Sequence, residues 1–211
     1  MGNYSKVMFQ VLKILSLPTA ILLLSACSTN PVTNKVEFDL VPEFQEIAMG
    51  SEQYMGQRQQ QQGDYIVDQA LTDYVRGVGR RLVAVSDRRL PYEFVVVNSS
   101  DFNAWALPGG KIGINRGLLA RLKCESELAA VLAHEIVHAA ASHGTSNMSK
   151  RMALGAISMA SGLVIDDEDT LQWVNGAVVI GGGLMVMKYG RDHELESDHY
   201  GMTYMARAGQ G

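Results

Sequence analysis

The stretch "AAVLAHEIVHAAASHG", residues 129–144, places two histidines and a glutamate inside a run built almost wholly from alanine, valine, leucine and isoleucine. A run of this length and apolar character predicts a buried helix. On that helix His134 and His138 lie one turn and about 40° apart, so both imidazoles face the same way. Two neutral imidazoles at this spacing can bind one zinc ion, with Glu135 beside the water that completes such a site.

A catalytic zinc site needs a third protein ligand. His143 lies five residues past His138, about 140° around an unbroken helix, so we expect it to point away, at a helix end or behind the ligands. Further along, "YGRDHELESDHYG" (residues 189–201) carries Glu194 and Asp198 four apart on one face of a predicted helix. One carboxylate can bind the metal while the other orients a ligating imidazole. The alternative is an acidic helix face exposed to solvent.

The first 26 residues are typical of a signal peptide. A positive start, with Lys6 and Lys13, leads into an apolar segment that ends in "LSAC" and resembles a bacterial lipobox. We expect lipidation of Cys27, which would anchor the protein without a transmembrane helix; an ordinary signal peptide cut at the same place is the alternative. Ser28 resembles outer-membrane sorting, so we expect an outer-membrane lipoprotein facing the periplasm. Residues 27–42 predict a polar tether.

The middle of the chain carries both helix and strand signals. A helix is predicted by a seam of apolar residues at helical spacing: Val67, Leu71, Tyr74, Val78, Leu82 and Val85. "PYEFVVVNS" (residues 91–99) predicts a strand, and "NAWALPGGKIGIN" (residues 103–115) predicts two short strands around a Pro-Gly-Gly turn.

Two apolar segments follow, "MALGAISMASGLVI" (residues 152–165) and "LQWVNGAVVIGGGLMVM" (residues 171–187), separated by an acidic turn. Each is shorter than the roughly 20 residues that a spanning helix needs. We therefore expect packed or interfacial helices, with transmembrane insertion as the weaker alternative. A last helix is expected from near Arg191 to about Arg207.

Composition narrows the class of protein. A chain of 211 residues, 47% hydrophobic and 19% charged, is long enough for one globular domain with a sizeable core. A net charge of -4 and the absence of a lysine and arginine cluster argue against a nucleic-acid partner. With Cys27 lipidated, Cys124 would have no disulfide partner within the chain.

At the two histidine and carboxylate segments the chain resembles the HtpX-like and CAAX-prenyl-protease-like zinc metallopeptidases, in particular their bacterial lipoprotein branch. The resemblance rests on "NPVTN", "NAWALPGGKIGINRGLL", "ELAAVLAHEIVHAAASHG" and "ELESD". It implies that His134, His138 and Glu194 bind one Zn²⁺, that Glu135 is the catalytic acid/base, and that Asp198 supports the site as a second carboxylate.

The resemblance also implies a substrate-binding strand. Asn103, Ala104, Trp105 and Ala106 match the strand along which such enzymes hold an extended peptide, a mode in which the substrate pairs with the backbone. An ordinary edge hairpin is the alternative. Relatives usually continue with further helices beyond the point that corresponds to residue 211, which leaves a C-terminally truncated domain as an open alternative.

Together these patterns predict an α+β fold: a mostly helical, zincin-type (gluzincin-like) metallopeptidase domain over residues 43–211, with a small antiparallel sheet beside the active-site helix. We expect a zinc-dependent endopeptidase that cuts misfolded or unassembled envelope proteins in quality control. A non-catalytic, lipid-anchored periplasmic scaffold or chaperone with a structural zinc is the alternative. The oxyanion donor stays open among four residues: Arg191, His199, Tyr200 and Tyr204.

Overall fold

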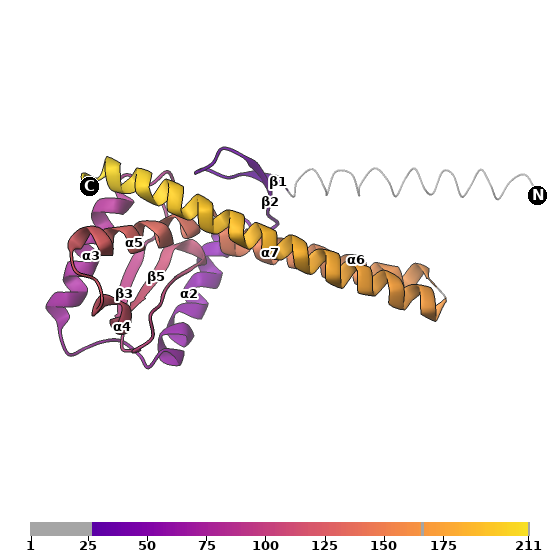
Figure 1. Ribbon diagram of the computed structural model, residues 1–211, viewed down its shortest axis with the longest axis horizontal. Helices are drawn as coiled ribbons and strands as arrows, with labels where there is room; N and C mark the ends of the chain where they lie inside the picture. The colour runs from indigo at the N-terminus through magenta and orange to yellow at the C-terminus, as the bar shows by residue number, and fades with distance from the viewer. Residues whose placement is uncertain (1–26, 166, 211) are drawn as a thin grey trace, which may run out of the picture.

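The computed structural model describes residues 27–165 and 167–210, so the expected signal peptide of residues 1–26 lies outside the described residues. Figure 1 shows a body of helices around a small sheet, from which two long helices extend together. In chain order the elements are β1 (Cys27–Thr29), β2 (Val36–Phe38), α2 (Glu43–Gln60), α3 (Gln69–Val83), β3 (Glu93–Val97), β4 (Ala104–Leu107), the 3₁₀ turn η1 (Pro108–Gly110), β5 (Lys111–Asn115), α4 (Arg116–Leu119), α5 (Glu125–Ala140), α6 (His143–Val164) and α7 (Glu168–Arg207).

The expected α+β class, mostly helical with a small sheet, is confirmed, but the sheet is mixed and not antiparallel throughout. The strand order is β3-β5-β4: β4 pairs antiparallel with β5, whereas β3 pairs parallel with β5. The Pro-Gly-Gly turn closes the β4–β5 hairpin as predicted. Every residue of β5 is buried, so this strand takes the centre, and β3 runs in the same direction on its other side.

Helices α3 and α5 cover one face of this sheet and bury the main core against it (Figure 1). Val78 and Leu82 lie on the buried face of α3 as the seam predicted. Val67 and Tyr74 do not: α3 begins only at Gln69, which leaves Val67 outside it, and Tyr74 lies at the exposed edge of the face. The buried stripe of α3 also includes Thr72, Val75 and Gly79, so it is shifted to one side of the predicted seam.

Helix α2 closes the other side of the sheet and packs on the turn η1. Tyr54 meets the ring of Trp105 edge-on at 6.2 Å between centroids. At Gly50 the helix touches the turn so closely that a Cβ atom would lie 1.8 Å from the carbonyl oxygen of Pro108. This contact fixes the turn between the two strands of the hairpin.

The segment expected to be a tether folds back onto the body. Strands β1 and β2 pair antiparallel, and the Asn30 side chain holds the turn between them by accepting from the backbone N–H of Val32. Val32 is buried in the main core, and the Asn30 amide also donates to the carbonyl of Ala141. Residues 27–38 thus form a hairpin that packs at the junction of α5 and α6, and they are not the free tether that we expected. The Cys27 side chain is outside the description.

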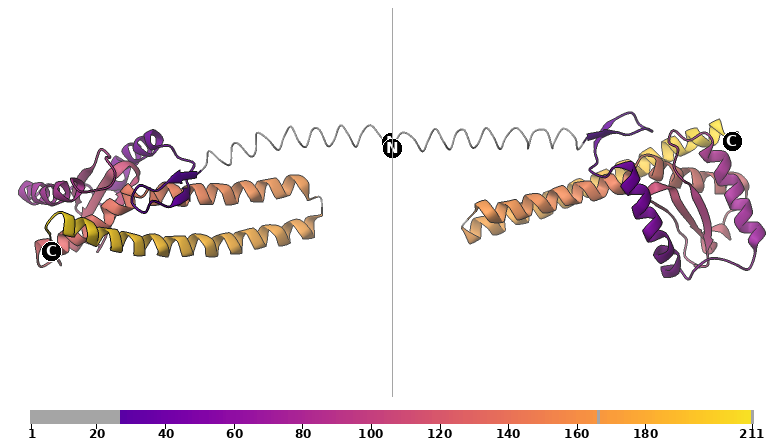
Figure 2. Two further views of the ribbon diagram at one scale, coloured as in Figure 1. Left: turned by 90° about the horizontal axis from the view of Figure 1, so that it is seen from above. Right: turned by 180° about the vertical axis from the view of Figure 1, so that it is seen from behind.

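The two apolar segments, expected as packed or interfacial helices, are not packed into the core. They lie in α6 and α7, which run antiparallel and project beyond the body as a helical hairpin (Figure 2). The second segment and the last helix, expected separately, form one continuous helix of 40 residues. By length and composition α7 is the one helix among the described residues that could cross a membrane, and only 6% of its most apolar stretch is buried.

Candidate metal centre

The C-terminal half of helix α5 presents its polar side chains on one side. Leu132, Ala133, Ile136 and Val137 are fully buried against the core, and the intervening His134, Glu135 and His138 face outward from it. The two imidazoles lie 3.0 Å apart from Nε2 to Nε2. The predicted pairing of the two histidines on one helix face is present in the structure.

Glu194 of α7 joins this pair. Its carboxylate oxygens lie 3.3 Å from His134 Nε2 and 3.5 Å from His138 Nε2. One ligand atom from each of the three residues falls within 4.8 Å of the others, which is the spacing that a single metal ion needs. Helix α7 can approach this closely because Gly201 lies against the backbone of α5, where a Cβ atom would be 3.2 Å from His134 N.

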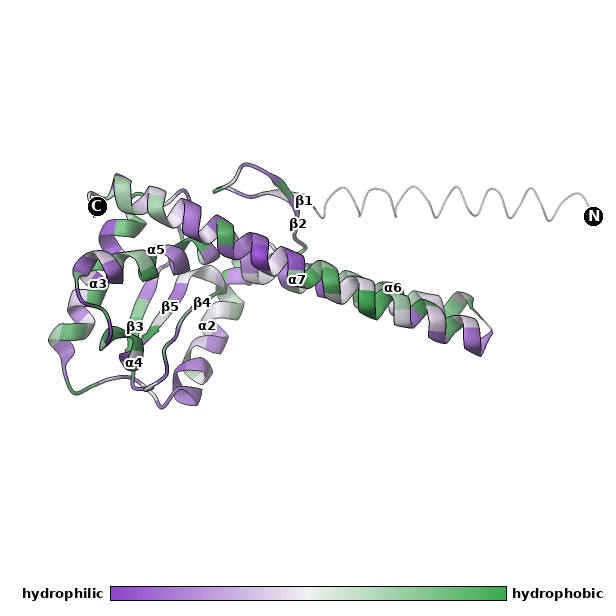
Figure 3. Ribbon diagram, viewed as in Figure 1, coloured by the Kyte–Doolittle hydropathy of each residue, from purple (hydrophilic) through white to green (hydrophobic). Residues whose placement is uncertain are grey.

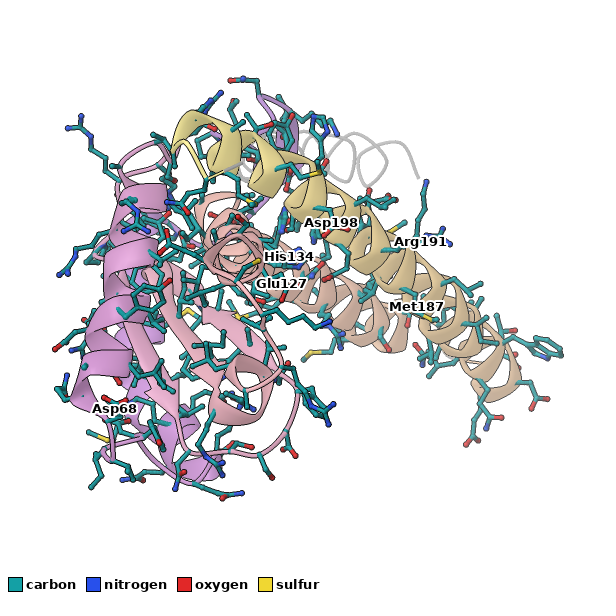
Figure 4. The ribbon with its side chains drawn as sticks, turned by 60° about the vertical axis from the view of Figure 1, so that its left-hand side comes forward. Asp68, Glu127, His134, Met187, Arg191 and Asp198 are labelled. Atoms are coloured by element: carbon teal, nitrogen blue, oxygen red, sulfur yellow. The ribbon has the colours of Figure 1, made fainter. Side chains whose placement is uncertain are left out.

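In both His134 and His138 the Nδ1 atom has a hydrogen-bond partner, which leaves Nε2 facing the three-residue group. Asp198 Oδ1 lies 2.9 Å from His134 Nδ1 (Figure 4). An ionised carboxylate only accepts hydrogen bonds, so the proton of His134 lies on Nδ1, and the lone pair on Nε2 points at the group. Asp198 therefore stands where a carboxylate that orients a ligating imidazole belongs.

His143 takes the corresponding position behind His138, at a helix end and behind the ligands as expected, but it points toward His138 and not away from it. Helix α5 ends at Ala140, and Ser142 adopts a left-handed conformation (φ 55°) that turns the chain before α6 begins at His143. The turn brings His143 Nδ1 to 3.0 Å from His138 Nδ1. The argument from an unbroken helix failed because the helix is broken.

A second layer of side chains surrounds His143. Its Nε2 lies 3.5 Å from Glu196, which in turn accepts a hydrogen bond from Lys35 of the β1–β2 hairpin. If the proton of His143 is on the Nε2 that faces Glu196, then His143 Nδ1 can accept a hydrogen bond from His138 Nδ1. The proton of His138 is then on Nδ1, and His138 Nε2 is unprotonated. His193 stacks on His143 with centroids 4.0 Å apart. Glu196 and His193 thus lie behind the three-residue group and not within it.

The protonation of the group suits a metal ion. Burial, reinforced by the neighbouring imidazoles of His134 and His193, lowers the pKa of His138 to about 4, so this ring is neutral at physiological pH. Burial raises the pKa of the Glu135 carboxyl to about 7, with Glu194 adding to the effect and His134 opposing it. Neutral imidazole nitrogens with a carboxylate are the donor set that zinc takes in catalytic sites, so the residues present fit this metal.

The group faces a cavity of about 470 Å³ that also receives Glu135. Strand β4 forms a wall of this cavity, and residues 103–108 all contribute to the lining. Ala104 and Ala106 face the core beneath α5, while the Trp105 ring packs on the opposite face of the sheet. Among the described strands β4 pairs only with β5, so its other edge is available along the cavity.

The sequence did not locate every polar residue of the cavity. None of the four residues considered as oxyanion donors is among the described residues that line it. Tyr204 instead lies in the core, where its hydroxyl donates to Asp87. Asn147 and His193 do line the cavity, and no spacing rule could have placed them there, because both depend on the turn at Ser142 and the crossing of α7 over α5.

Comparison with known proteins agrees with this geometry. The family model described as peptidase family M48 matches residues 69–211. The beta-barrel assembly-enhancing protease of Yersinia pestis is 28% identical over 90% of this chain and 44% of its own length. The mitochondrial metalloendopeptidase OMA1 of Schizosaccharomyces pombe is 30% identical over 84% of this chain and 52% of its own length. The beta-barrel assembly-enhancing protease of Escherichia coli is 28% identical over 81% of this chain and 38% of its own length.

The chain thus spans about half or less of the length of these curated relatives. The family match covers the three-stranded sheet, the histidine helix α5 and the helices α6 and α7, and with them the three-residue group and all of the cavity lining except Glu46 of α2. The chain belongs to peptidase family M48.

Proposed function

We propose that this chain is a zinc-dependent endopeptidase that hydrolyses peptide bonds of cell-envelope proteins in protein quality control. The observation that carries the proposal is the convergence of His134, His138 and Glu194 on one cavity that also holds Glu135 and the edge of β4 that no other described strand pairs with. Each of these parts serves a different step of peptide hydrolysis, and together they leave room for a substrate.

His134 and His138 would hold the zinc through Nε2, and Glu194 would hold it through its carboxylate. When bound, zinc supplies the Lewis acidity that activates water and polarises a scissile carbonyl. A structural zinc normally has four protein ligands, often cysteines. Cys124 is exposed and lines a different cavity, so the donor set favours catalysis over the scaffold alternative.

Glu135 is the proposed acid/base. It accepts a proton from the attacking water and passes that proton to the leaving amine. Asp198 keeps the His134 proton on Nδ1 and so positions the ring without touching the reacting atoms. The edge of β4, at Asn103, Ala104, Trp105 and Ala106, binds the substrate as an added strand through its backbone N–H and C=O groups.

The proposed location is the periplasmic face of the outer membrane, with the chain anchored by acyl groups on Cys27. The support is the lipobox-like "LSAC" and the serine that follows it. Two relatives are named for β-barrel assembly, which supports envelope proteins as substrates. Another relative is named as mitochondrial, so the family alone does not decide the compartment.

The test is digestion of casein and of a denatured outer-membrane protein by the full chain, with and without a zinc chelator and with zinc restored. The Glu135→Gln variant should keep its zinc but lose about 100-fold or more of the activity, because an amide cannot accept the proton. Glu127→Gln is the matched control, since this exposed glutamate lies on the same helix outside the cavity. Cleavage by Glu135→Gln at the wild-type rate, or cleavage that survives complete zinc removal, would contradict the proposal.

A further inference from the structure

The hairpin of α6 and α7 has a nonpolar outer surface on all sides. Between residues 152 and 163 of α6, and between 173 and 187 of α7, every exposed residue whose burial is described is nonpolar. The largest of them include Leu163, which is 87% exposed, and Trp173, which is 81% exposed. Helices in water carry a polar face opposite their apolar one, so this surface is not one made for water.

Three polar side chains in the middle of the hairpin are turned inward, whereas Gln172, near the tip, is exposed. Ser158 and Ser161 donate to the side-chain oxygen of Asn175 at 2.8 and 3.0 Å, from one helix to the other. Both serines and the asparagine are only partly exposed, at the seam between the helices. Backbone groups are satisfied within the two helices, as a lipid environment demands. Polar groups that bond to each other inside and nonpolar groups outside are typical of helices in a membrane.

Charges bracket this nonpolar section at both ends. The base of the section, nearest the body, carries four basic residues: Lys150, Arg151, Lys188 and Arg191. Those of α6 and those of α7 lie side by side, because Lys150 Nζ is 3.8 Å from the centre of the Tyr189 ring. Within residues 27–165 and 167–210, none of Arg151, Lys188 and Arg191 forms an ion pair. Acidic residues form the tip, and Figure 3 shows the polar tip beyond the apolar bands of both helices.

The length of the charge-free section suits a bilayer. At about 1.5 Å per residue, residues 152–165 extend about 21 Å and residues 170–187 about 27 Å. The hydrocarbon core of a bilayer is about 30 Å thick and thins locally at small cost. The cations at the base suit the phosphates of anionic lipid headgroups.

The expected lipid attachment site lies at the same end of the hairpin. Cys27 begins β1, only three residues before Asn30, which binds the carbonyl of Ala141 where α5 gives way to α6. The same segment donates the Leu40 backbone N–H to Ser149, close to the base of α6. An acyl chain on Cys27 and the base of the hairpin would therefore meet one membrane together.

We propose that the α6–α7 hairpin is embedded along its nonpolar section in the hydrocarbon core of a lipid bilayer, with its basic base in the headgroup layer nearest the peptidase body. The metal group then lies close to the membrane surface, because Glu194 follows Met187 by only seven residues, about 10 Å along α7. Figure 4 shows Met187 on the same helix as Asp198, the partner of His134. The enzyme would act on polypeptides at that surface. The embedding itself does not depend on lipidation or on peptidase activity.

Trp173 reports this embedding directly. It is one of two tryptophans, and the other, Trp105, is buried in the body. The full chain is reconstituted in vesicles of phosphatidylcholine and phosphatidylglycerol, with part of the phosphatidylcholine brominated on its acyl chains. Trp173 emission should shift to shorter wavelength and be quenched by the bromines, and the Trp173→Phe variant should lose this quenching. In that background Ile180→Trp, at mid-section, should be quenched most by bromines near the chain ends.

A charged residue placed in the nonpolar section of the hairpin should prevent its embedding in the bilayer. Ile180→Glu and Leu184→Glu should each lower the ratio of embedded to exposed hairpin about 100-fold. Ile66→Glu is the matched control, since Ile66 is 83% exposed on the body, and it should change nothing. Trp173 that remains open to aqueous iodide and is not quenched by the bromines overturns the proposal. Protection of Trp173 from iodide that rises with protein concentration and needs no lipid also overturns the proposal, because a second copy of the chain then covers the hairpin.

Discussion

The ion pair between Arg88 and Glu46 should contribute strongly to stability, because it is buried and holds three elements together. Glu46 of α2 is 2% exposed and accepts from Arg88 at 2.6 Å, while the Arg88 side chain is 12% exposed. Arg88 also donates to the carbonyl of Ala139 and to Ser142 Oγ, at the end of α5. The pair therefore supports the turn that brings His143 behind the metal group.

The two single variants should differ in cost. Arg88→Met leaves the Glu46 carboxylate buried, with only weak contacts to Ser142 Oγ at 3.3 Å and Gly109 N at 3.5 Å, so we expect a loss of about 3–5 kcal/mol in the free energy of unfolding. Glu46→Met leaves Arg88 with the exposed carboxylate of Glu43 at 3.0 Å, so the loss should be smaller, about 2 kcal/mol. The double variant, which removes both charges, should be more stable than Arg88→Met alone.

Urea unfolding followed by circular dichroism, with all four proteins in chelator so that metal binding does not contribute, gives the double-mutant cycle. The interaction energy should exceed about 1 kcal/mol, since the two groups are in direct contact. Two single variants that each cost less than about 1 kcal/mol, or costs that simply add, would refute the view that burial makes this pair important. Arg76 and Asp73, an exposed pair at 3.1 Å on α3, should give almost no interaction energy by the same cycle.

Three further outcomes are expected. Asp198→Ala should weaken zinc binding about 10-fold, measured by competition with a fluorescent chelator. This is the low end for an orienting carboxylate, because Asp198 is 70% exposed, and Asp192→Ala should leave zinc binding unchanged. Gly50→Ala should destabilise the fold by about 1–3 kcal/mol in urea unfolding, because its Cβ would collide with Pro108, while Gly56→Ala, where a Cβ meets nothing, should be neutral or slightly stabilising. Zinc at about 100 times its dissociation constant should raise the unfolding free energy by about 2.7 kcal/mol, measured as a rise in melting temperature that the chelator reverses.

The parts of the site that follow from helix periodicity could be predicted from the sequence. Spacing of four residues placed His134 with His138 on one face, and Glu194 with Asp198 on another, and the fold brings these two faces together. What periodicity could not give is how one helix crosses another. That crossing depends on Gly201, whose missing side chain lets α7 lie against the backbone of α5.

Elements that depend on a single backbone conformation were beyond a reading of periodicity. The left-handed conformation of Ser142 decides whether His143 points away from His138 or lies against it, and the residue at this position is a serine, not the glycine that usually marks such a break. The sheet was misjudged for a related reason. Strand signals predict where strands lie, but the parallel pairing of β3 with β5 depends on which strand is buried at the centre.

The hairpin shows a different limit, because hydropathy measures how apolar a segment is and not what surrounds it. Residues 152–165 and 171–187 have the composition of packed core helices, and the same composition suits lipid. The deciding feature is the direction of the few polar side chains. In a core helix they would face water, whereas three of the four, Ser158, Ser161 and Asn175, face one another between α6 and α7, and Gln172 alone is exposed, near the tip. That direction follows from how α6 and α7 pair, which brings together residues 14 and 17 apart in sequence, and it is the structural reason to test these helices against a bilayer.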